Sequence, residues 1–343
     1  MAFSTINKGS LYQNTVLYTG DGSSQSITGV GFQPDMTWFK CRSAAHEHQL
    51  YDAVRGVTKR IVPNDTSAEG TQANGLTAFG ADGFTVDDAN GTGGDTQTYA
   101  SWNWKAGTTS VPSGGSITPS AVSINTTSGF GIYKYTGTGS AGTIAHGLGA
   151  IPEMVITKGL DSASKRWSVG HQGIAWTHEL FLETDEAKGV TSGAWNDTNP
   201  TDTLITLGTG GNGNSSGVNY IMYAWTPISG YSKFGSYIGN GNADGTFIFT
   251  GFKPAFVMIK HTNGTSNWTI NDTGRDPTNV NNLRLFPNQN VAESSGSDSM
   301  DMLSNGFKLR STDGGNNGSG DSYIYMAFGQ SLVGSNNVPC TAR

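Results

Sequence analysis

The chain has 343 residues, of which 13% are charged, 10% are aromatic and 49 are glycine, and its formal net charge is −6. This length suits two or three domains, and the aromatic content excludes a low-complexity tail. The acidic balance, with no stripe of Lys and Arg, argues against nucleic acid as a partner. No apolar run is long enough for a membrane-spanning helix, and the N-terminus lacks the apolar segment of a signal peptide.

The chain begins with the polar stretch MAFSTINKGSLYQNT, which shows no apolar periodicity. We expect residues 1–17 to form an arm that docks onto a neighbouring protein. The pattern YTGDGSSQSITGVGFQPDMTWFK then starts at Tyr18. It returns at Tyr135 as YTGTGSAGTIAHGLGAIPEMVITK and at Tyr237 as YIGNGNADGTFIFTGFKPAFVMIK. The recurrence predicts three copies of one module.

Further landmarks recur in the same order in each copy. Each stretch contains a proline that anchors the alignment, at Pro34, Pro152 and Pro254, and ends in a lysine, at Lys40, Lys158 and Lys260. A glycine-rich loop and an aromatic strand such as YASWNWKA follow later in each copy. The predicted divisions are an arm (1–17), module 1 (18–112), a Pro/Gly/Ser-rich linker (113–128), module 2 (129–228) and module 3 (229–343).

The segments within a module have the composition of short β-strands. The runs MTWFK, MVITK and FVMIK are apolar or aromatic and follow a proline, which favours extended backbone. Each glycine turn leads from one strand into another, and no helix or Gly-Lys-Ser/Thr follows, so these glycines indicate β-turns rather than a phosphate-binding loop. Short helices are expected only within 51–61 and 178–189. The sequence therefore predicts an all-β fold of three tandem, jelly-roll-like β-sandwich modules of about 100 residues each.

Two acid–base pairs stand at equal offsets from the closing lysines. Asp52 and Arg55 follow the first lysine, and Asp272 and Arg275 follow the third. A carboxylate beside a base can serve in catalysis. The middle copy has His171 in place of the acid and no arginine, so we interpret the pairs as ion pairs that brace each module rather than as a catalytic site.

An aromatic ring precedes each of these positions by the same interval, at His48, Trp167 and Trp268. The pattern favours a core or sheet-face position. If Trp167 and Trp268 were exposed, they could instead stack on a sugar ring.

The sequence offers weak candidates for a metal site. His46 and His48 form a His-x-His triplet, which on a strand could supply two metal ligands, but a solvated loop is the favoured interpretation. The loop DDANGTGGD from Asp87 resembles a calcium loop without its final glutamate. Cys41 and Cys340 are expected to be unpaired thiols. No catalytic motif is present, and no cofactor is expected.

The repeated pattern, together with HQLYDAVRG, DGFTV and YASWNWKA, resembles a module of virion structural and tail-fibre-like proteins of marine tailed bacteriophages. The resemblance covers nearly the whole chain, and the first and third copies match it best. It implies a virion component, assembled in the host cytoplasm, with β-sandwich modules. It supplies no catalytic or binding residues.

The leading hypothesis is a non-enzymatic virion structural protein of the tail-fibre, appendage or capsid-decoration type. Such a protein would bind other virion proteins, assemble with itself as a trimer, and adhere to the host surface. The alternative is a carbohydrate-binding protein with exposed aromatic rings beside Asn or Asp side chains on an open face. A third hypothesis, a glycan-cleaving tailspike, would need two carboxylates facing each other across a groove.

Overall fold

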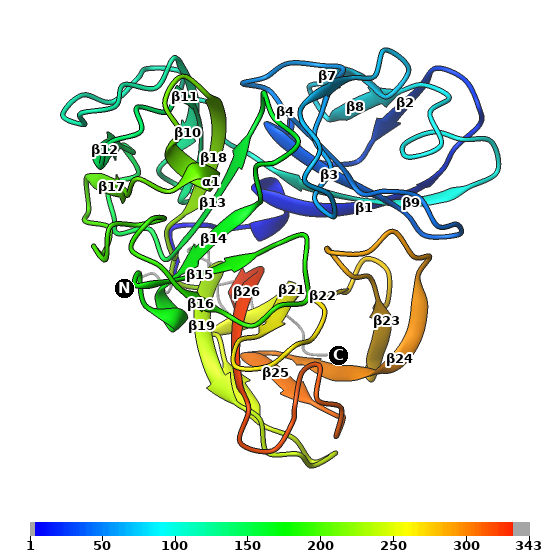
Figure 1. Ribbon diagram of the computed structural model, residues 1–343. Helices are drawn as coiled ribbons and strands as arrows, with labels where there is room; N and C mark the ends of the chain where they lie inside the picture. The colour runs from blue at the N-terminus through cyan, green and yellow to red at the C-terminus, as the bar shows by residue number, and fades with distance from the viewer. Residues whose placement is uncertain (1–3, 332–343) are drawn as a thin grey trace.

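The computed structural model describes residues 4–331 of the chain. Within that range the regular structure is almost all strand, and the helical segments are single turns at η1 (Gly9–Leu11), η2 (Gln172–Ile174) and α1 (Gly211–Asn214). The predicted all-β class is confirmed. No helix in the described part of the chain is long and apolar enough to cross a membrane. Figure 1 shows the strands gathered into three lobes around a common centre.

Each lobe is built on one large antiparallel sheet with the same strand order. In lobe 1, β9 (Thr98–Trp104) lies between β1 (Gln13–Thr19) and β3 (Met36–Cys41), and β4 (Gln49–Asp52) follows β3. The matching strands are β11 (Phe130–Thr136), β18 (Asn219–Trp225), β13 (Met154–Gly159) and β14 (Ser168–His171) in lobe 2, and β19 (Ser232–Ile238), β26 (Ser322–Ser331), β21 (Phe252–His261) and β22 (Thr269–Asp272) in lobe 3.

The register repeats along with the strand order. The opening tyrosine of each repeat pairs with a tyrosine of the aromatic strand, and the two rings stack. These pairs are Tyr18–Tyr99, Tyr135–Tyr220 and Tyr237–Tyr323, with centroid separations of 5.1, 5.4 and 5.0 Å. The matching registers allow positions in the three lobes to be equated residue by residue.

A smaller sheet covers the outer face of each large sheet. Its strands are β2 (Gln25–Thr28), β8 (Gly83–Val86) and β7 (Leu76–Gly80) in lobe 1, β12 (Gly142–Ala145) and β17 (Leu204–Leu207) in lobe 2, and β20 (Phe247–Phe249), β25 (Gly306–Leu309), β24 (Ser294–Leu303) and β23 (Asn281–Arg284) in lobe 3. The short strands β5 (Lys59–Arg60), β6 (Gly70–Thr71), β10 (Ala121–Asn125), β15 (His178–Phe181) and β16 (Gly189–Val190) complete the fold. Each lobe is therefore a two-sheet sandwich with its own apolar core.

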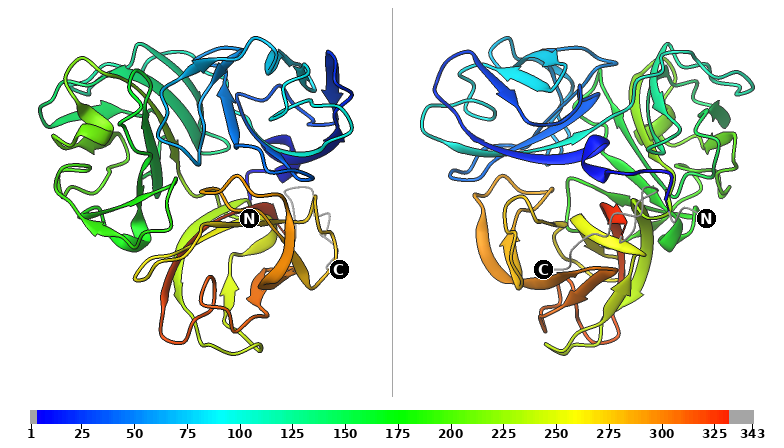
Figure 2. Two further views of the ribbon diagram at one scale, coloured as in Figure 1. Left: turned by 45° about the vertical axis from the view of Figure 1, so that its right-hand side comes forward. Right: turned by 180° about the vertical axis from the view of Figure 1, so that it is seen from behind.

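The other face of each large sheet points to the centre of the molecule, where the lobes share a fourth core (Figure 2). Its central members are Met36, Trp38, Trp102 and Trp104 of lobe 1, Met154, Ile156, Tyr223 and Trp225 of lobe 2, and Phe256, Met258, Met326 and Phe328 of lobe 3. Both faces of each large sheet are thus buried. This explains why strands such as β3 show no alternation of apolar and polar residues.

The glycines of the opening turns have two separate roles. A Cβ at Gly20 would overlap the carbonyl oxygen of Gly94, and the matching glycines of the other lobes meet a loop carbonyl in the same way. The next glycine of each turn has a positive φ, +69° at Gly22 and +64° at Gly241. These segments are turns between strands, and no helix follows them.

The structure corrects several expected boundaries. The predicted arm ends inside β1, and its residue Ile6 lies in the central core of its own chain, so the described part of the arm packs on lobe 3. Gly9 N donates to Gln330 Oε1 at 2.5 Å. The predicted linker contains β10. The segments 51–61 and 178–189 form strands and turns, because their apolar side chains pack against sheets.

Candidate functional site

A buried lysine is the second-last residue of the same strand in each lobe. Each lysine ammonium donates to a carbonyl of the preceding lobe around the ring. The donor–acceptor pairs are Lys40–Asn290 (3.2 Å), Lys158–Thr66 (2.8 Å) and Lys260–Asp185 (3.1 Å). Each Nζ also donates to a carbonyl of its own lobe, at 2.6–2.8 Å. Burial lowers the pKa of all three lysines to about 8. The lysines therefore link each lobe to a loop of its neighbour.

The predicted aromatic positions lie at the same junctions. Trp167 Nε1 donates to Val62 O at 2.9 Å, and Trp268 Nε1 donates to Phe181 O at 3.0 Å, in each case in the preceding lobe. Both indole rings are buried, at 0% and 1% exposure. The core interpretation of this position is correct, and glycan stacking on these tryptophans is excluded because no ring face is open.

The histidine at the equivalent position in lobe 1 is also buried. His48 Nδ1 accepts from Trp38 Nε1 at 2.9 Å, and its Nε2 lies 2.9 Å from Phe286 O of lobe 3. Both ring nitrogens are engaged, so His48 cannot join His46 as a metal ligand. No cluster of three or more His, Cys, Asp or Glu suited to a metal ion occurs in residues 4–331. Cys41 is buried and unpaired, and Cys340 lies outside the described residues.

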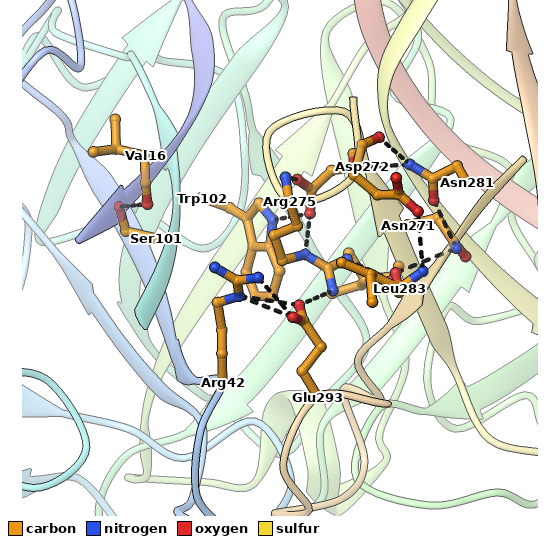
Figure 3. Close-up of polar contacts among 12 residues, drawn as sticks. Val16, Arg42, Ser101, Trp102, Asn271, Asp272, Arg275, Asn281, Leu283 and Glu293 are labelled. Atoms are coloured by element: carbon orange, nitrogen blue, oxygen red, sulfur yellow. Dashed lines mark hydrogen bonds and ion pairs between the residues drawn. The ribbon is translucent and has the colours of Figure 1, made fainter. Parts of the chain in front are cut away.

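The acid–base pair of lobe 3 belongs to a larger group at the junction with lobe 1 (Figure 3). Arg275 Nε donates to Asp272 Oδ2 at 2.5 Å, and Trp102 Nε1 of lobe 1 donates to the same oxygen at 3.0 Å. Arg275 also binds Glu293 at 2.9 Å, and Glu293 binds Arg42 of lobe 1 at 2.7 Å. The pair thus braces its own lobe and ties it to the next one.

Lobe 1 repeats this arrangement toward lobe 2. Arg55 Nε donates to Asp52 Oδ2 at 2.5 Å, and Tyr223 of lobe 2 donates its hydroxyl to that oxygen at 2.6 Å. Arg55 also binds Glu69 at 3.2 Å. The side chains of Asp52 and Arg55 are completely buried. Burial of the arginine charge is strongly unfavourable without the aspartate that neutralises it.

The junction between lobes 2 and 3 replaces the whole group. His171 stands for the aspartate and Ile174 for the arginine. Lys188 stands for the glutamate, because its N–H, like that of Glu69 and Glu293, donates to the carbonyl two residues after the closing lysine of the next lobe. His171 Nδ1 accepts from Gly173 N, which leaves Nε2 as the donor to Tyr325 O at 3.2 Å. Burial lowers the pKa of His171 to about 4, so the ring is neutral. The neutral ring of His171 and the aliphatic side chain of Ile174 therefore leave no buried charge at the positions of the aspartate and the arginine.

An open groove of about 750 Å³ lies between lobes 2 and 3. One wall carries Glu153 and Gln172 of lobe 2, and the other carries Lys233, Phe249 and Asn305 of lobe 3. Phe249 is 57% exposed, and burial raises the pKa of Glu153 to about 7. Within residues 4–331, the Glu153 carboxylate and the Asn305 amide form no hydrogen bond or ion pair. This groove is the candidate binding site, because it presents the Glu153 carboxylate and the Asn305 amide beside the exposed ring of Phe249.

A second, polar pocket of about 430 Å³ lies on lobe 1 beside His46. Its side chains largely satisfy one another: Arg60 Nη1 donates to Gln72 at 3.0 Å, and Asn74 donates to Asp88 at 2.6 Å. The loop of Asp88 is held by these contacts and by its own turn. The pocket therefore offers fewer unpaired groups than the groove between lobes 2 and 3.

Sequence reasoning missed three features of these sites. It aligned the closing lysines without assigning them a function, and it did not pair Glu69 or Glu293 with the arginines. The signal was present, because Lys188 replaces the glutamate in the one copy that lacks the arginine. The groove gave no local signal, since its walls come from two different repeats.

Comparison with known proteins adds one finding. The family model described as "Domain of unknown function (DUF7483)" matches residues 8–331, from just before η1 to the end of β26. No curated protein and no solved structure matches the chain. Because the match spans all three lobes and more than half of the chain, this protein belongs to the DUF7483 family.

Proposed function

We propose that the chain is a non-enzymatic structural protein of a bacteriophage virion, of the tail-fibre, appendage or capsid-decoration type, that acts in assembly and in adhesion to the host surface. The observation that carries this proposal is the use of the repeated ionisable residues. Asp52, Arg55, Asp272 and Arg275 are buried and hold the lobes together. A rigid body of this kind suits a particle component better than a catalyst. The resemblance of the repeats to phage virion modules supports the same role.

Detection in purified particles tests the proposal. Antibodies raised against the recombinant protein would be used for immunogold microscopy of gradient-purified virions and for blotting of the same fractions. We expect labelling at one fixed position on each particle. Protein that is confined to the host lysate and absent from intact particles would contradict the virion role. Light scattering of the pure protein tests the predicted trimer separately.

Carbohydrate binding is a second candidate, and the groove provides its specific observation. The exposed ring of Phe249 lies beside Asn305 and Glu153, which is the combination of an apolar face with hydrogen-bonding groups that sugars use. Saturation-transfer NMR with glucose, galactose, mannose and N-acetylglucosamine tests it. Transfer that disappears in Phe249→Ala supports sugar binding, and the absence of transfer from all four sugars contradicts it.

A further inference from the structure

The groove between lobes 2 and 3 has an equivalent at each of the other junctions. Each groove is lined by the residue that follows the anchoring proline of one lobe. This residue is Asp35 at the junction of lobes 1 and 2, Glu153 at that of lobes 2 and 3, and Ala255 at that of lobes 3 and 1. The edge strand facing it is β11, β19 or β1, respectively. The groove between lobes 3 and 1 has a volume of about 360 Å³ and is lined partly by the N-terminal segment. The three junctions can therefore be compared position by position.

The chain itself fills the groove between lobes 1 and 2. Strand β10 pairs antiparallel with the edge strand β11, with Ser123 opposite Ile132. Ser123 Oγ donates to Asp35 Oδ1 at 2.9 Å, and Ala106 N donates to Asp35 Oδ2 at 2.8 Å. An extended segment thus completes the sheet and satisfies the carboxylate that lines the groove.

The groove between lobes 2 and 3 also has a sheet edge to extend and a carboxylate to satisfy, but no strand within residues 4–331 does either. Strand β19 is the edge of its sheet. Tyr231 O and Gly239 N bond toward β26, so the backbone groups of Phe234 and Ser236 point the other way, to the outer edge of β19. Phe234 lines the groove. Among the described residues, Phe234 O receives one substitute bond, from Gln172 Nε2 at 2.5 Å. The carboxylate of Glu153, at the position of Asp35, forms no hydrogen bond in that part of the chain, whereas its backbone N–H donates to Trp225 O.

We propose that this groove binds an extended strand of another polypeptide, which adds antiparallel to β19 as β10 adds to β11 and donates a serine or threonine hydroxyl to Glu153. The strand would replace the Gln172 side chain at Phe234 O, and its apolar residues would pack against Phe249. The inference rests on the proposed assembly role in one respect: that role identifies the source of the strand as a partner protein of the particle. The binding mode follows from the internal repeat.

The segment that fills the equivalent groove supplies the probe. A fluorescein-labelled peptide of residues 119–127, PSAVSINTT, would be titrated with the full chain and followed by anisotropy. Hydrogen exchange measured by mass spectrometry would locate the site. We expect saturable binding with slowed exchange in β19. A peptide with Ser123→Ala should bind about tenfold more weakly, because it cannot donate to Glu153, and a peptide with Ser123→Pro should not bind, because it also loses the backbone N–H at that position.

Two matched protein variants identify the edge strand. Ser236→Pro removes an N–H from the outer edge of β19, where the peptide would pair, and leaves the bonds to β26 intact, so it should abolish binding. Leu17→Pro is the same change at the equivalent position of β1 and should leave binding unchanged. Thermal melting confirms that both variants are folded.

Three results would overturn the proposal. The first is no anisotropy change with the unmodified peptide. The second is binding that persists in Ser236→Pro. The third is a dimer of the pure protein that this variant dissociates, because the occupant would then be a second copy of the chain. Failure here leaves the virion proposal intact, since that depends on detection in particles.

Discussion

At the scale of single residues, each of the two charged junction groups is built around a fully buried aspartate–arginine pair. Arg275 has a fully buried side chain, and its charge is neutralised by Asp272 and Glu293. Removing one partner of such a pair lowers the free energy of unfolding strongly, because the other charge stays buried without a counter-charge. Replacing both partners by apolar residues costs much less. Lobe 2 shows the other solution, in which the entire group is replaced.

Asp272→Ala should therefore lower the free energy of unfolding by about 3 kcal/mol or more, since Arg275 and Trp102 both lose an acceptor. Chemical denaturation of the variant and the parent measures the change. The control is Glu186→Ala, which breaks the ion pair of an exposed glutamate with Arg166 and should cost less than about 1 kcal/mol. Equal losses in the two variants would contradict the bracing role.

His171 gives the stability a dependence on pH. Its pKa is about 4 in the folded protein and 6.5 when unperturbed. The stability from the neutral ring is fully present above pH 6.5 and is lost as the pH falls toward 4, because the unfolded chain binds the extra proton. The loss amounts to about 3 kcal/mol. In His171→Gln, the decrease in the free energy of unfolding between pH 6.5 and pH 4 should be smaller by that amount. Denaturant titration of both proteins at each pH measures the difference.

Glu153 contributes with the opposite sign. Its raised pKa, about 7, favours the folded state below pH 4.5, and this stability is lost as the pH rises through 7. The His171→Gln variant retains Glu153, so the difference between the two proteins isolates the histidine. Identical pH profiles in parent and variant would show that His171 is not buried as a neutral ring.

At the scale of elements, β10 shows how a connecting segment becomes part of a sheet. Ser123→Ala removes the hydroxyl that donates to Asp35 and accepts from Gly107 N, and both groups are left short of a partner. We expect a loss of about 1–3 kcal/mol. Ser120→Ala, an exposed change just before the strand, should cost less than about 0.5 kcal/mol. Chemical denaturation of both variants measures the two changes. If Ser123→Ala left the free energy of unfolding unchanged, Asp35 would not depend on β10 for a hydrogen-bond partner.

The elements also show how far the sequence could predict the structure. The strands of the repeated runs, such as the one that contains Lys40, could be predicted together with their order in the chain. Their composition and the spacing from the preceding proline are signals within a few residues of each strand. The position of Trp167 in the fold could not be predicted from the residues around it in the sequence. Its ring is buried against Val62 O, which is more than a hundred residues away in the chain, and the same indole pattern could have faced solvent. Helices expected within 51–61 and 178–189 failed for the same reason, since tertiary packing overrode short-range propensity.

At the scale of the whole molecule, the central core makes the lobes dependent on one another. Isolated lobe 3, residues 229–331, would expose Phe256, Met326 and Phe328, which are all at most 3% exposed in the full chain. We expect this fragment to show no cooperative unfolding transition. The full chain should melt in one transition with equal calorimetric and van't Hoff enthalpies. A fragment that melts cooperatively, or three separate transitions in the full chain, would contradict this interdependence.

The ring of three covalently joined lobes also has a genetic consequence. If three identical chains formed such a ring, every substitution would appear at all three junctions at once, and losing an aspartate would weaken each of them. In a single chain each junction mutates alone. The change to His171, Ile174 and Lys188 at one junction could therefore arise while the other two retained their acid–base groups, and one groove could keep its own strand while another stayed open to a foreign one.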